Sequence, residues 1–153
     1  AEMERAGKLS AIVTQNIDGL HQAAGSKNVF ELHGSVHRNY CQKCGKFFDV
    51  NYVVNAKGVP YCDECGGIIK PDVVLYEEGL DSQTINGAVR AISKADMLII
   101  GGTSLVVYPA AGMIDYFKGK YLAVLNRDAT SRDKQADLCI TDPIGEVLGR
   151  IRV

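Results

Sequence analysis

Short apolar runs recur along the chain, and each one ends in polar residues. The runs occupy residues 11–14, 28–32, 96–100, 121–125 and 137–141. Strands that are apolar at every position are typical of a parallel sheet whose two faces are both covered by helices. The pattern therefore predicts buried strands at these five places. A further strand-like run follows the middle of the chain, at residues 71–76.

Segments with a helical spacing of apolar residues separate these runs. They occupy residues 17–24, 82–94, 109–118 and 144–151. Asp81 or Ser82 is suited to cap the second segment, and Pro109 suits the first turn of the third. Strands that alternate with helices predict the α/β class, with a parallel sheet covered by helices on both faces. The first seven residues are typical of the end of a helix, so we expect further residues before them.

Residues 40–67 interrupt this alternation. Apolar residues become fewer there, and Cys, Gly, Lys and aromatic residues become more frequent. This change predicts a small inserted module, residues 40–67, within an α/β domain that comprises residues 1–39 and 68–153. Because the module has few apolar residues, we expect its fold to depend on something other than a hydrophobic core.

The composition is that of an ordinary folded protein. Of 153 residues, 46% are hydrophobic and 23% charged, which excludes a disordered or fibrous chain. The formal net charge is -1, so we expect neither nucleic acid nor an anionic membrane as a partner. No apolar run approaches the ~20 residues of a membrane-spanning helix. Two CxxC pairs and one further cysteine favour a reducing compartment, and we expect the protein to be cytoplasmic.

The most specific pattern is formed by four cysteines. Cys41 and Cys44 form one CxxC pair, Cys62 and Cys65 form the other, and 17 residues separate the pairs. This spacing falls in the range of zinc sites, and each pair can direct two thiolates at one ion. Four thiolates leave no open coordination position, so the predicted zinc is structural. Cys139 lies in an apolar run, where we expect a small buried side chain without a role.

Two alternatives to a structural zinc site remain at this level. A CxxC pair can be a redox site, although two pairs at this separation favour zinc. A zinc ribbon can also bind nucleic acid through basic side chains. Here Arg38, Lys43, Lys46 and Lys57 are largely offset by acidic residues, namely Asp49, Asp63 and Glu64, which favours a solvated face.

Polar side chains directly follow the first predicted strand. Gln15, Asn16 and Asp18 lie where open α/β sheets bind their ligands, at the carboxyl end of a parallel strand. Amide groups both donate and accept hydrogen bonds, so they suit a carboxamide or a ribose, and Asp18 can accept from an amide N–H. The alternative is that Asn16 or Asp18 caps the next helix.

A histidine ends the second predicted strand. His33 precedes Gly34, which permits a close approach of the backbone. With an ordinary pKa of ~6.5, His33 can act as a general base near neutral pH. Position and the glycine neighbour favour it over His21 and His37, although any single histidine is more often structural than catalytic.

Two later loops carry a similar polar character. Gly102, Thr103 and Ser104 follow one buried strand, and Asn126 and Arg127 follow the next. Backbone N–H groups, hydroxyls and an amide suit the hydroxyl groups of a ribose. Because carboxyl ends of parallel strands meet at the same edge of a sheet, both loops are predicted to lie at one edge.

The order of these motifs resembles a known family. TQNIDGLH, ELHG, the two CxxC pairs, KPDVVLYEEGL, GTSLVVYPAA and VLNRD occur in this order over nearly the whole chain. They resemble the catalytic core of the sirtuins, which are NAD-dependent protein lysine deacylases. The resemblance implies a Rossmann-like domain with a small zinc module, and NAD and an acyl-lysine peptide that meet in the cleft between them.

The resemblance also implies roles for individual residues. His33 matches the catalytic histidine, and Gln15, Asn16 and Asp18 match residues near the nicotinamide and its ribose. Residues that match the ribose and adenine side of NAD are Gly102, Thr103, Ser104, Asn126, Arg127 and Ile144. Peptide-binding residues are expected in two extended segments that bind mainly backbone, and they are Val73, Val74, Tyr76, Leu105 and Val106.

The reaction that the resemblance implies releases nicotinamide and O-acyl-ADP-ribose. The acyl oxygen attacks the nicotinamide ribose, and the histidine then activates a ribose hydroxyl. Two departures stand out: this chain has no Gly-rich turn with a following Pro-Asp-Phe-Arg segment, and it has Tyr76-Glu77-Glu78 where many relatives have Phe-Gly-Glu. We therefore expect the C-terminal part of a sirtuin core that lacks the NAD-phosphate loop. The alternative is a catalytically inert, zinc-containing binding module.

Overall fold

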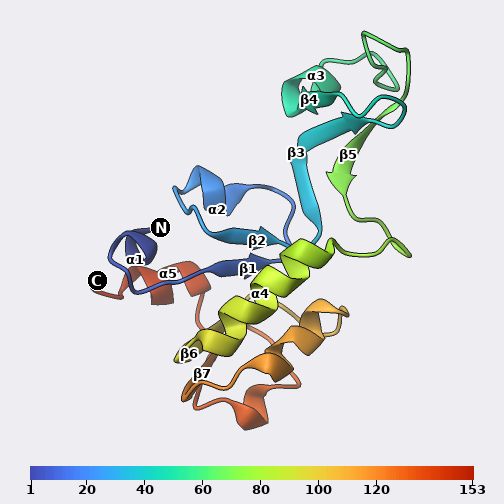
Figure 1. The fold of residues 1–153 in the computed structure, drawn as a ribbon. Coiled ribbons are helices and arrows are strands. Elements are labelled where there is room, and N and C mark those ends of the chain that lie inside the picture. The colour runs from blue at the N-terminus through green and yellow to red at the C-terminus, as the bar shows by residue number, and fades with distance from the viewer. The chain divides into compact units, whose positions relative to one another are not determined.

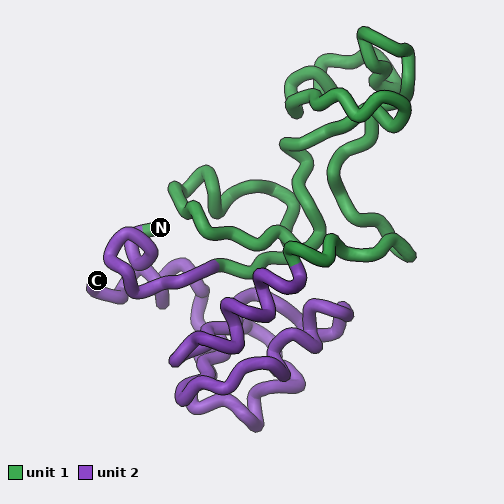
Figure 2. The backbone as a smooth tube through the Cα atoms, in the orientation of Figure 1, with its two compact units in different colours: residues 1, 12–84 green, residues 2–11, 85–153 purple.

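The computed structural model describes all of residues 1–153, which form two compact units. Unit 1 comprises residues 1 and 12–84, and unit 2 comprises residues 2–11 and 85–153 (Figure 2). These bounds differ from those expected from the sequence, because the cysteine module and the first two strands belong to the same unit. The division into residues 1–39 with 68–153 and residues 40–67 thus stays a prediction. No helix has the length and apolar character that a membrane crossing requires.

Unit 1 contains two small sheets (Figure 1). In the first sheet, β1 (Ile12–Thr14) pairs with β2 (Val29–Glu31) in parallel, and α2 (Leu20–Ala23) connects them. In the second, β3 (Gly34–Cys41) lies between β4 (Phe47–Asp49) and β5 (Ile69–Val73), both antiparallel to it. The β-α-β order expected for residues 11–32 is confirmed, although the helix is shorter than residues 17–24.

The strand expected at residues 71–76 begins earlier and has a different role. β5 ends at Val73 and pairs antiparallel with β3, so it does not extend the parallel sheet. The antiparallel pairing follows from the chain direction, since β3 leads into the cysteine module and β5 leads out of it (Figure 1). The two strands thus connect the module to the residues around His33.

The cysteine module has a small core of its own. Cys41, Phe48, Cys62 and Ile69 are buried together, and Val53 and Cys65 pack against them. α3 (Val50–Val54) closes over this cluster, and the Asp49 carboxylate caps it by accepting from the Tyr52 N–H at 2.9 Å. Two of the four buried residues are cysteines. The expectation of a module without any core is therefore wrong, but the core is largely made of predicted metal ligands.

Unit 2 contains a parallel sheet in the order β6–β7–β8. Its strands are β6 (Met97–Gly101), β7 (Tyr121–Leu125) and β8 (Leu138–Ile140). The other elements are α1 (Glu2–Arg5), η1 (Ala110–Tyr116), η2 (Asp133–Gln135) and α5 (Ile144–Gly149). α4 (Ser82–Lys94) begins in unit 1 and continues into unit 2. Asp81 caps α4 as expected, because its carboxylate accepts from the Thr84 N–H at 2.7 Å.

The α/β class is confirmed, but several details of the expected sheet are wrong. The parallel strands form two separate sheets, of two and three strands, rather than one. Cys139 is exposed rather than buried, and Leu138 beside it is 49% exposed. The apolar run at residues 137–141 predicts burial on both faces, whereas β8 is the edge strand and nothing in the chain covers it fully. The segment after Pro109 is a 3-10 helix and not an α-helix.

Candidate functional site

The loop after β1 brings together the first group of predicted site residues. Gln15, Asn16 and Asp18 lie between the end of β1 and the start of α2, and Asn16 and Asp18 are exposed. The Asn16 N–H donates to Thr14 Oγ1 at 3.1 Å, and Asn16 Nδ2 lies 3.5 Å from Asp18 Oδ2. The predicted cluster of amide and carboxylate groups therefore exists at the carboxyl end of β1.

Asp18 also bonds to the local backbone. Its Oδ1 accepts from the Leu20 N–H at 3.0 Å at the start of α2. The capping alternative is thus partly correct for Asp18, since one carboxylate oxygen orders the helix start. The other oxygen faces Asn16, so a structural role and a ligand-binding role are compatible at this residue.

His33 is fixed to this loop by a single hydrogen bond. Its Nδ1 lies 3.0 Å from the backbone oxygen of Gln15. Because a carbonyl oxygen only accepts, Nδ1 must carry the hydrogen, and Nε2 of the neutral ring keeps its lone pair. The bond therefore selects the tautomer in which Nε2 can accept a proton. A general base at this position needs that arrangement.

Gly34 confirms the predicted close approach of two backbones. Its φ is +75°, and a Cβ on this residue would overlap the carbonyl oxygen of Asp72 on β5. The Val74 N–H donates to the His33 oxygen at 3.1 Å, one residue further along. Only glycine permits the strands to lie this close. As a result, His33 and the segment that begins at Val73 are neighbours.

The segment after β5 is ordered by an ion pair. Lys70 Nζ donates to the Val73 oxygen at 2.9 Å and to Glu78 Oε2 at 3.2 Å. Glu78 Oε2 also accepts from the Leu75 N–H at 2.9 Å, and this bond, followed by the Lys70 ammonium, lowers the pKa of Glu78. These bonds fix the chain around the predicted peptide-binding residues Val73, Val74 and Tyr76.

Two features of this segment suit the binding of a partner. Tyr76 is fully exposed, and Val74 is half-buried. Glu77 has a φ of 71°, in the left-handed region that favours glycine, at the position where the resembled family commonly has glycine. The departure from Phe-Gly-Glu therefore keeps the backbone shape that a glycine would permit.

A cavity of about 370 Å³ in unit 2 contains the second group of predicted residues. It lies at the carboxyl ends of β6 and β7, where the sequence places the ribose-binding loops. Gly102 has a φ of 61°, and its N–H donates to the Leu125 oxygen at 3.1 Å, which joins the two loops. The lining residues are Gly102, Thr103, Ser104, Leu125, Asn126, Arg127, Asp128, Ala129 and Asp142.

Ile144, which is predicted on the ribose and adenine side, does not line this cavity. Of the predicted peptide-binding residues nearby in the sequence, Leu105 packs against the core of β6 and β7, and Val106 is 70% exposed. Ile144 begins α5 and its Cδ1 occupies the space beside Gly101. Conversely, the sequence singled out Asp128 only as a neighbour of Arg127, and it missed Asp142. Asp142 directly follows the run at residues 137–141, so the strand-end rule that found Asn126 could have found it.

The four cysteine sulfurs form one cluster, in which all Sγ atoms lie within 4.8 Å of one another. Across the two motifs, Cys41 Sγ lies 3.4 Å from Cys65 Sγ, and Cys44 Sγ lies 3.7 Å from Cys62 Sγ. A tetrahedron with Zn–S bonds of ~2.3 Å has S···S edges of about 3.8 Å, so the cluster fits this ion. Because all four sulfurs from both CxxC motifs converge on one point, the arrangement fits a single metal site better than a redox pair within one motif.

The protein environment favours deprotonation of one of these thiols. The backbone N–H groups of Cys44 and Lys43 lower the pKa of Cys41 to about 6, although burial opposes them. At Cys65 the Gly67 N–H lowers the pKa, but Cys41 Sγ, burial and the other sulfurs outweigh it and raise the pKa. Four sulfurs so close together cannot all carry negative charge without a cation, as a thiolate–zinc site requires.

The basic residues of the module are partly neutralised. Lys46 donates to Asp63 at 2.7 Å and to Glu64 at 2.9 Å, which ties the first CxxC motif to the second. Arg38 also forms ion pairs, with Glu31 at 2.6 Å and Asp72 at 2.8 Å. The charges of these two basic side chains are therefore offset within the fold.

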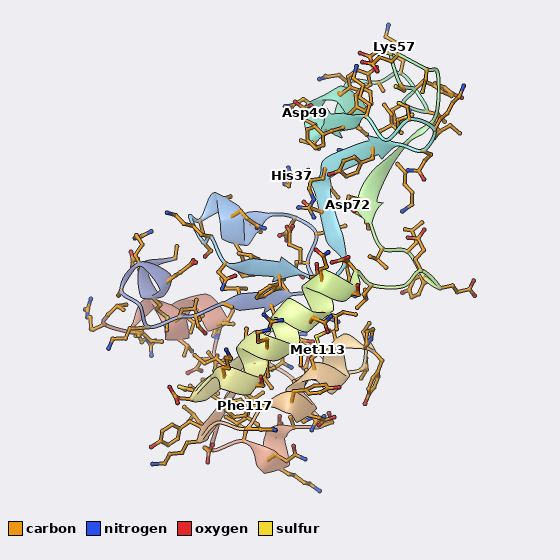
Figure 3. The ribbon with its side chains drawn as sticks, in the orientation of Figure 1. His37, Asp49, Lys57, Asp72, Met113 and Phe117 are labelled. Carbon is orange, nitrogen blue, oxygen red and sulfur yellow. The ribbon has the colours of Figure 1, made fainter.

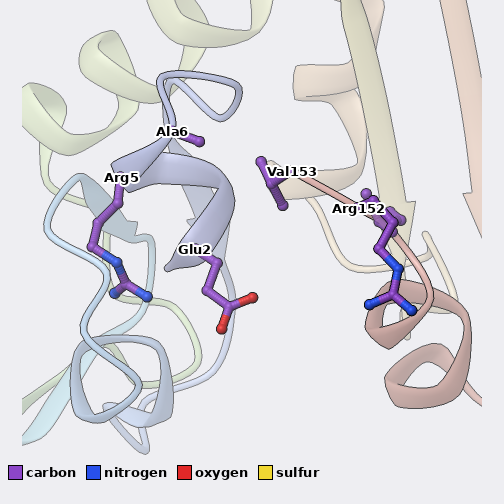
Figure 4. Close-up of a pocket in the computed structure, with 6 residues that line it drawn as sticks. Glu2, Arg5, Ala6, Arg152 and Val153 are labelled. Atoms are coloured by element: carbon purple, nitrogen blue, oxygen red, sulfur yellow. The ribbon is translucent and has the colours of Figure 1, made fainter.

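A further cavity of about 550 Å³ lies in unit 2 between α1 and the last residues of the chain (Figure 4). It contains none of the residues that the sequence predicts to act. Its lining consists of Glu2, Arg5, Ala6, Ile151, Arg152 and Val153.

Comparison with protein families gives a match to the family described as the Sir2 family, over residues 1–109. The chain belongs to the Sir2 family. This match covers the loop after β1, His33, the cysteine module and the predicted peptide-binding residues.

Individual relatives agree with this assignment. The chain is 66% identical to a protein of Clostridium acetobutylicum over 97% of its length, and 66% identical to one of Clostridium perfringens over 99%. Both are named NAD-dependent protein deacetylase. The chain spans 61% and 62% of their lengths, so it corresponds to about three fifths of each.

Solved structures of the Sir2 family have the same fold. A complex described as Sir2, p53 peptide and NAD+ matches with a TM-score of 0.90 and 39% identity, over 98% of this chain and 65% of the other. Sir2Tm bound to a propionylated peptide matches with the same TM-score and identity, over the same shares. The parallel sheets, the helices and the cysteine module of this Sir2 chain therefore have counterparts in experimental structures.

Proposed function

We propose that the protein containing this chain removes acetyl or other acyl groups from protein lysine side chains, in a reaction that consumes NAD and releases nicotinamide and O-acyl-ADP-ribose. The observation that carries the proposal is the hydrogen bond between His33 Nδ1 and the Gln15 oxygen, 3.0 Å long. It leaves Nε2 as a base beside a loop of amide and carboxylate groups. The names of the relatives and the ligands of the solved complexes support the same reaction.

The residues of unit 1 would act on the nicotinamide end of NAD. Gln15 and Asn16 can bond the carboxamide, and Asp18 can accept from its N–H or from a ribose hydroxyl. NAD supplies a ribose carbon that loses nicotinamide and takes up the acyl oxygen. His33 Nε2 would remove a proton from the ribose hydroxyl that completes the acyl transfer.

The cavity in unit 2 would bind the other ribose and the adenine. Asn126 and Ser104 offer groups for ribose hydroxyls, and the Asp128 and Asp142 carboxylates accept hydrogen bonds from hydroxyls or from an amino group. Its ~370 Å³ is within the usual range of small-ligand sites. Ile144 lies next to it rather than in its wall.

Zinc is proposed as a structural ion held by Cys41, Cys44, Cys62 and Cys65. The ion would link the two CxxC motifs through its bonds to their thiolates. Besides the cysteines, the buried core that these motifs share contains only Phe48 and Ile69. Since all four ligands come from the chain, the ion takes no part in catalysis.

The substrate is proposed to be a protein segment with an acylated lysine. Val73 ends β5 and Val74 follows it, whereas Tyr76 lies in a turn. Leu105 and Val106 lie in the second predicted segment, and Leu105 has a left-handed φ of 56°, so neither segment is extended throughout as expected. We propose that the extended part at Val73 and Val74 binds the peptide mainly through its backbone, with weak sequence preference. We also propose a cytoplasmic location, supported by five cysteines that form no disulfide bond, and no role for nucleic acid or membrane lipids.

The full-length protein, an acetyl-lysine peptide and NAD test this function together. Mass spectrometry should show deacetylated peptide, nicotinamide and O-acetyl-ADP-ribose in equal amounts, and no product without NAD. Deacetylation that proceeds equally well without NAD, or the absence of turnover, would contradict the proposal. An inert zinc-containing module would show no turnover.

A further inference from the structure

β3 contains an irregularity that the predicted mechanism does not use. Ser35 pairs with Asp72 of β5, but the next paired residue of β3 is Asn39, which lies opposite Pro71. Residues 36–38 therefore have no partner on β5 and form a bulge. Figure 3 shows His37 at this bent part of β3, and Asp72 lies on the neighbouring strand. Bulges redirect side chains and are frequent beside active sites.

The bulge bonds to the loop that carries the predicted nicotinamide-binding residues. The Val36 N–H donates to the Ile17 oxygen at 3.1 Å, and His37 Nε2 lies 2.9 Å from the Asp18 oxygen. Because the Asp18 oxygen only accepts, His37 Nε2 must carry a hydrogen. Two consecutive carbonyl groups of the loop are thus held by two consecutive residues of the bulge.

The His37 ring also lies against the backbone of the next loop residue. Gly19 has a φ of +68°, and a Cβ on it would lie 2.7 Å from His37 Cδ2 and 2.9 Å from Nε2. The loop therefore turns into α2 directly under the imidazole. This packing and the hydrogen bond act on the same two residues, Asp18 and Gly19.

The bulge itself is anchored on three sides. Arg38 donates to Glu31 Oε2 of β2 at 2.6 Å and to Asp72 Oδ2 of β5 at 2.8 Å. The buried Asn39 donates through Nδ2 to the Val36 oxygen at 3.1 Å. His37 consequently projects from a fixed backbone, which lets its ring hold the loop instead of following it.

We propose that His37 is a positioning residue, whose Nε2–H holds the Asp18 and Gly19 backbone so that Asn16 and Asp18 present their side chains to the nicotinamide end of NAD. This role rests on the proposed function, which supplies NAD as the ligand. His37 itself would touch no reacting atom. His37 acts through the loop, so it affects the binding of NAD and not that of the acyl-lysine peptide.

Two amide substitutions at this residue separate a hydrogen bond from mere bulk. The Nε2 of glutamine reaches the place of the imidazole Nε2, whereas the Nδ2 of asparagine reaches only that of Nδ1. In the full-length enzyme, His37→Gln should therefore keep the KM for NAD within about twofold, since one donor replaces another. His37→Asn should raise it about three- to tenfold, as expected for one lost hydrogen bond, with the KM for acetyl-lysine peptide unchanged.

Several outcomes would overturn the proposal. They are equal effects of His37→Gln and His37→Asn, an unchanged KM for NAD in His37→Asn, and a parallel rise in both KM values. Hydrogen exchange of the amides at residues 17–20 provides a second readout that does not depend on turnover. If the wild-type protein has no NAD-dependent activity, the proposed function fails by itself. Faster exchange in His37→Asn than in His37→Gln then still supports the positioning role, and equal exchange overturns it.

Discussion

Gly34→Ala tests the contact that places His33 beside the segment after β5, which is predicted to bind the peptide. The added Cβ would overlap the Asp72 oxygen and lie 2.9 Å from the Asp72 carbonyl carbon and 3.4 Å from the Val73 Cα. These are backbone atoms, so no side-chain rotation can relieve the overlap. β3 and β5 would have to separate at the end of their pairing, next to His33.

Two effects determine the magnitude. A φ of +75° costs an alanine about 1–2 kcal/mol, because its Cβ approaches its own backbone. Separation of the strands also breaks the Val74 to His33 hydrogen bond and one or more neighbouring ladder bonds, at about 1 kcal/mol each. The free energy of unfolding should therefore fall by about 3–4 kcal/mol, of which the overlap accounts for at least half.

Urea unfolding of the full-length protein measures this loss, and Gly7→Ala is its matched control. Gly7 has a φ of +69°, but a Cβ there would meet nothing within 4 Å. The control therefore reports the cost of the backbone conformation alone, about 1–2 kcal/mol at most. A deacetylation assay run beside it should show a large loss of kcat for Gly34→Ala and full activity for Gly7→Ala.

Equal destabilisation by the two substitutions would refute this reasoning, because the strand overlap would then contribute nothing. Normal activity in Gly34→Ala would likewise show that the close approach of β3 and β5 is not needed at His33.

Three further predictions concern the site. His33→Asn keeps a donor for the Gln15 oxygen but has no Nε2. The kcat for deacetylation should therefore fall about 10²–10⁴-fold, with thermal stability unchanged. A smaller loss of kcat contradicts the role of His33 as a base. A strong chelator or Cys62→Ser should remove one zinc per chain, as measured by elemental analysis. Loss of the ion should also make residues 40–67 sensitive to proteases. Zinc that is retained in Cys62→Ser refutes the assignment of the four cysteines as its ligands. Glu78→Ala should raise the KM for peptide several-fold. Glu78→Gln should raise it less, because the amide oxygen still accepts from the Leu75 N–H. An equal rise in both variants contradicts the role of Glu78 in ordering the segment after β5.

Local sequence patterns predicted the features that depend on neighbouring residues. The CxxC spacing identified the four metal ligands, because each knuckle forms within a few residues. Asp81 predicted the start of α4, because a capping side chain accepts a hydrogen bond from a backbone N–H only three residues away. Polar residues at the end of β1 located the loop at Gln15, because the carboxyl ends of parallel strands carry ligand-binding loops. The same rule located the cavity at Gly102, where the carboxyl ends of β6 and β7 meet at one edge of their own sheet.

Features that depend on distant pairing did not follow from the sequence. Residues 71–76 look like a strand, but their sequence does not show that β5 pairs antiparallel with β3, which it does because it returns from the cysteine module. Cys139 looks buried, yet β8 is an edge strand and leaves it exposed. The apolar content of a strand does not show whether other elements cover its two faces. The sequence therefore predicts more burial for Cys139 than the structure has.

The sequence by itself determined the family, the α/β class, the zinc ligands and the candidate base His33, because these rest on residue types at fixed spacings. Only the tertiary structure decided which nitrogen of His33 is free, since that depends on the Gln15 oxygen, 18 residues earlier in the chain. The same holds for His37, which looked like one histidine among three. Its contact with Asp18 arises from a bulge in β3, and a bulge is a mismatch between two strands that neither strand's sequence reveals alone.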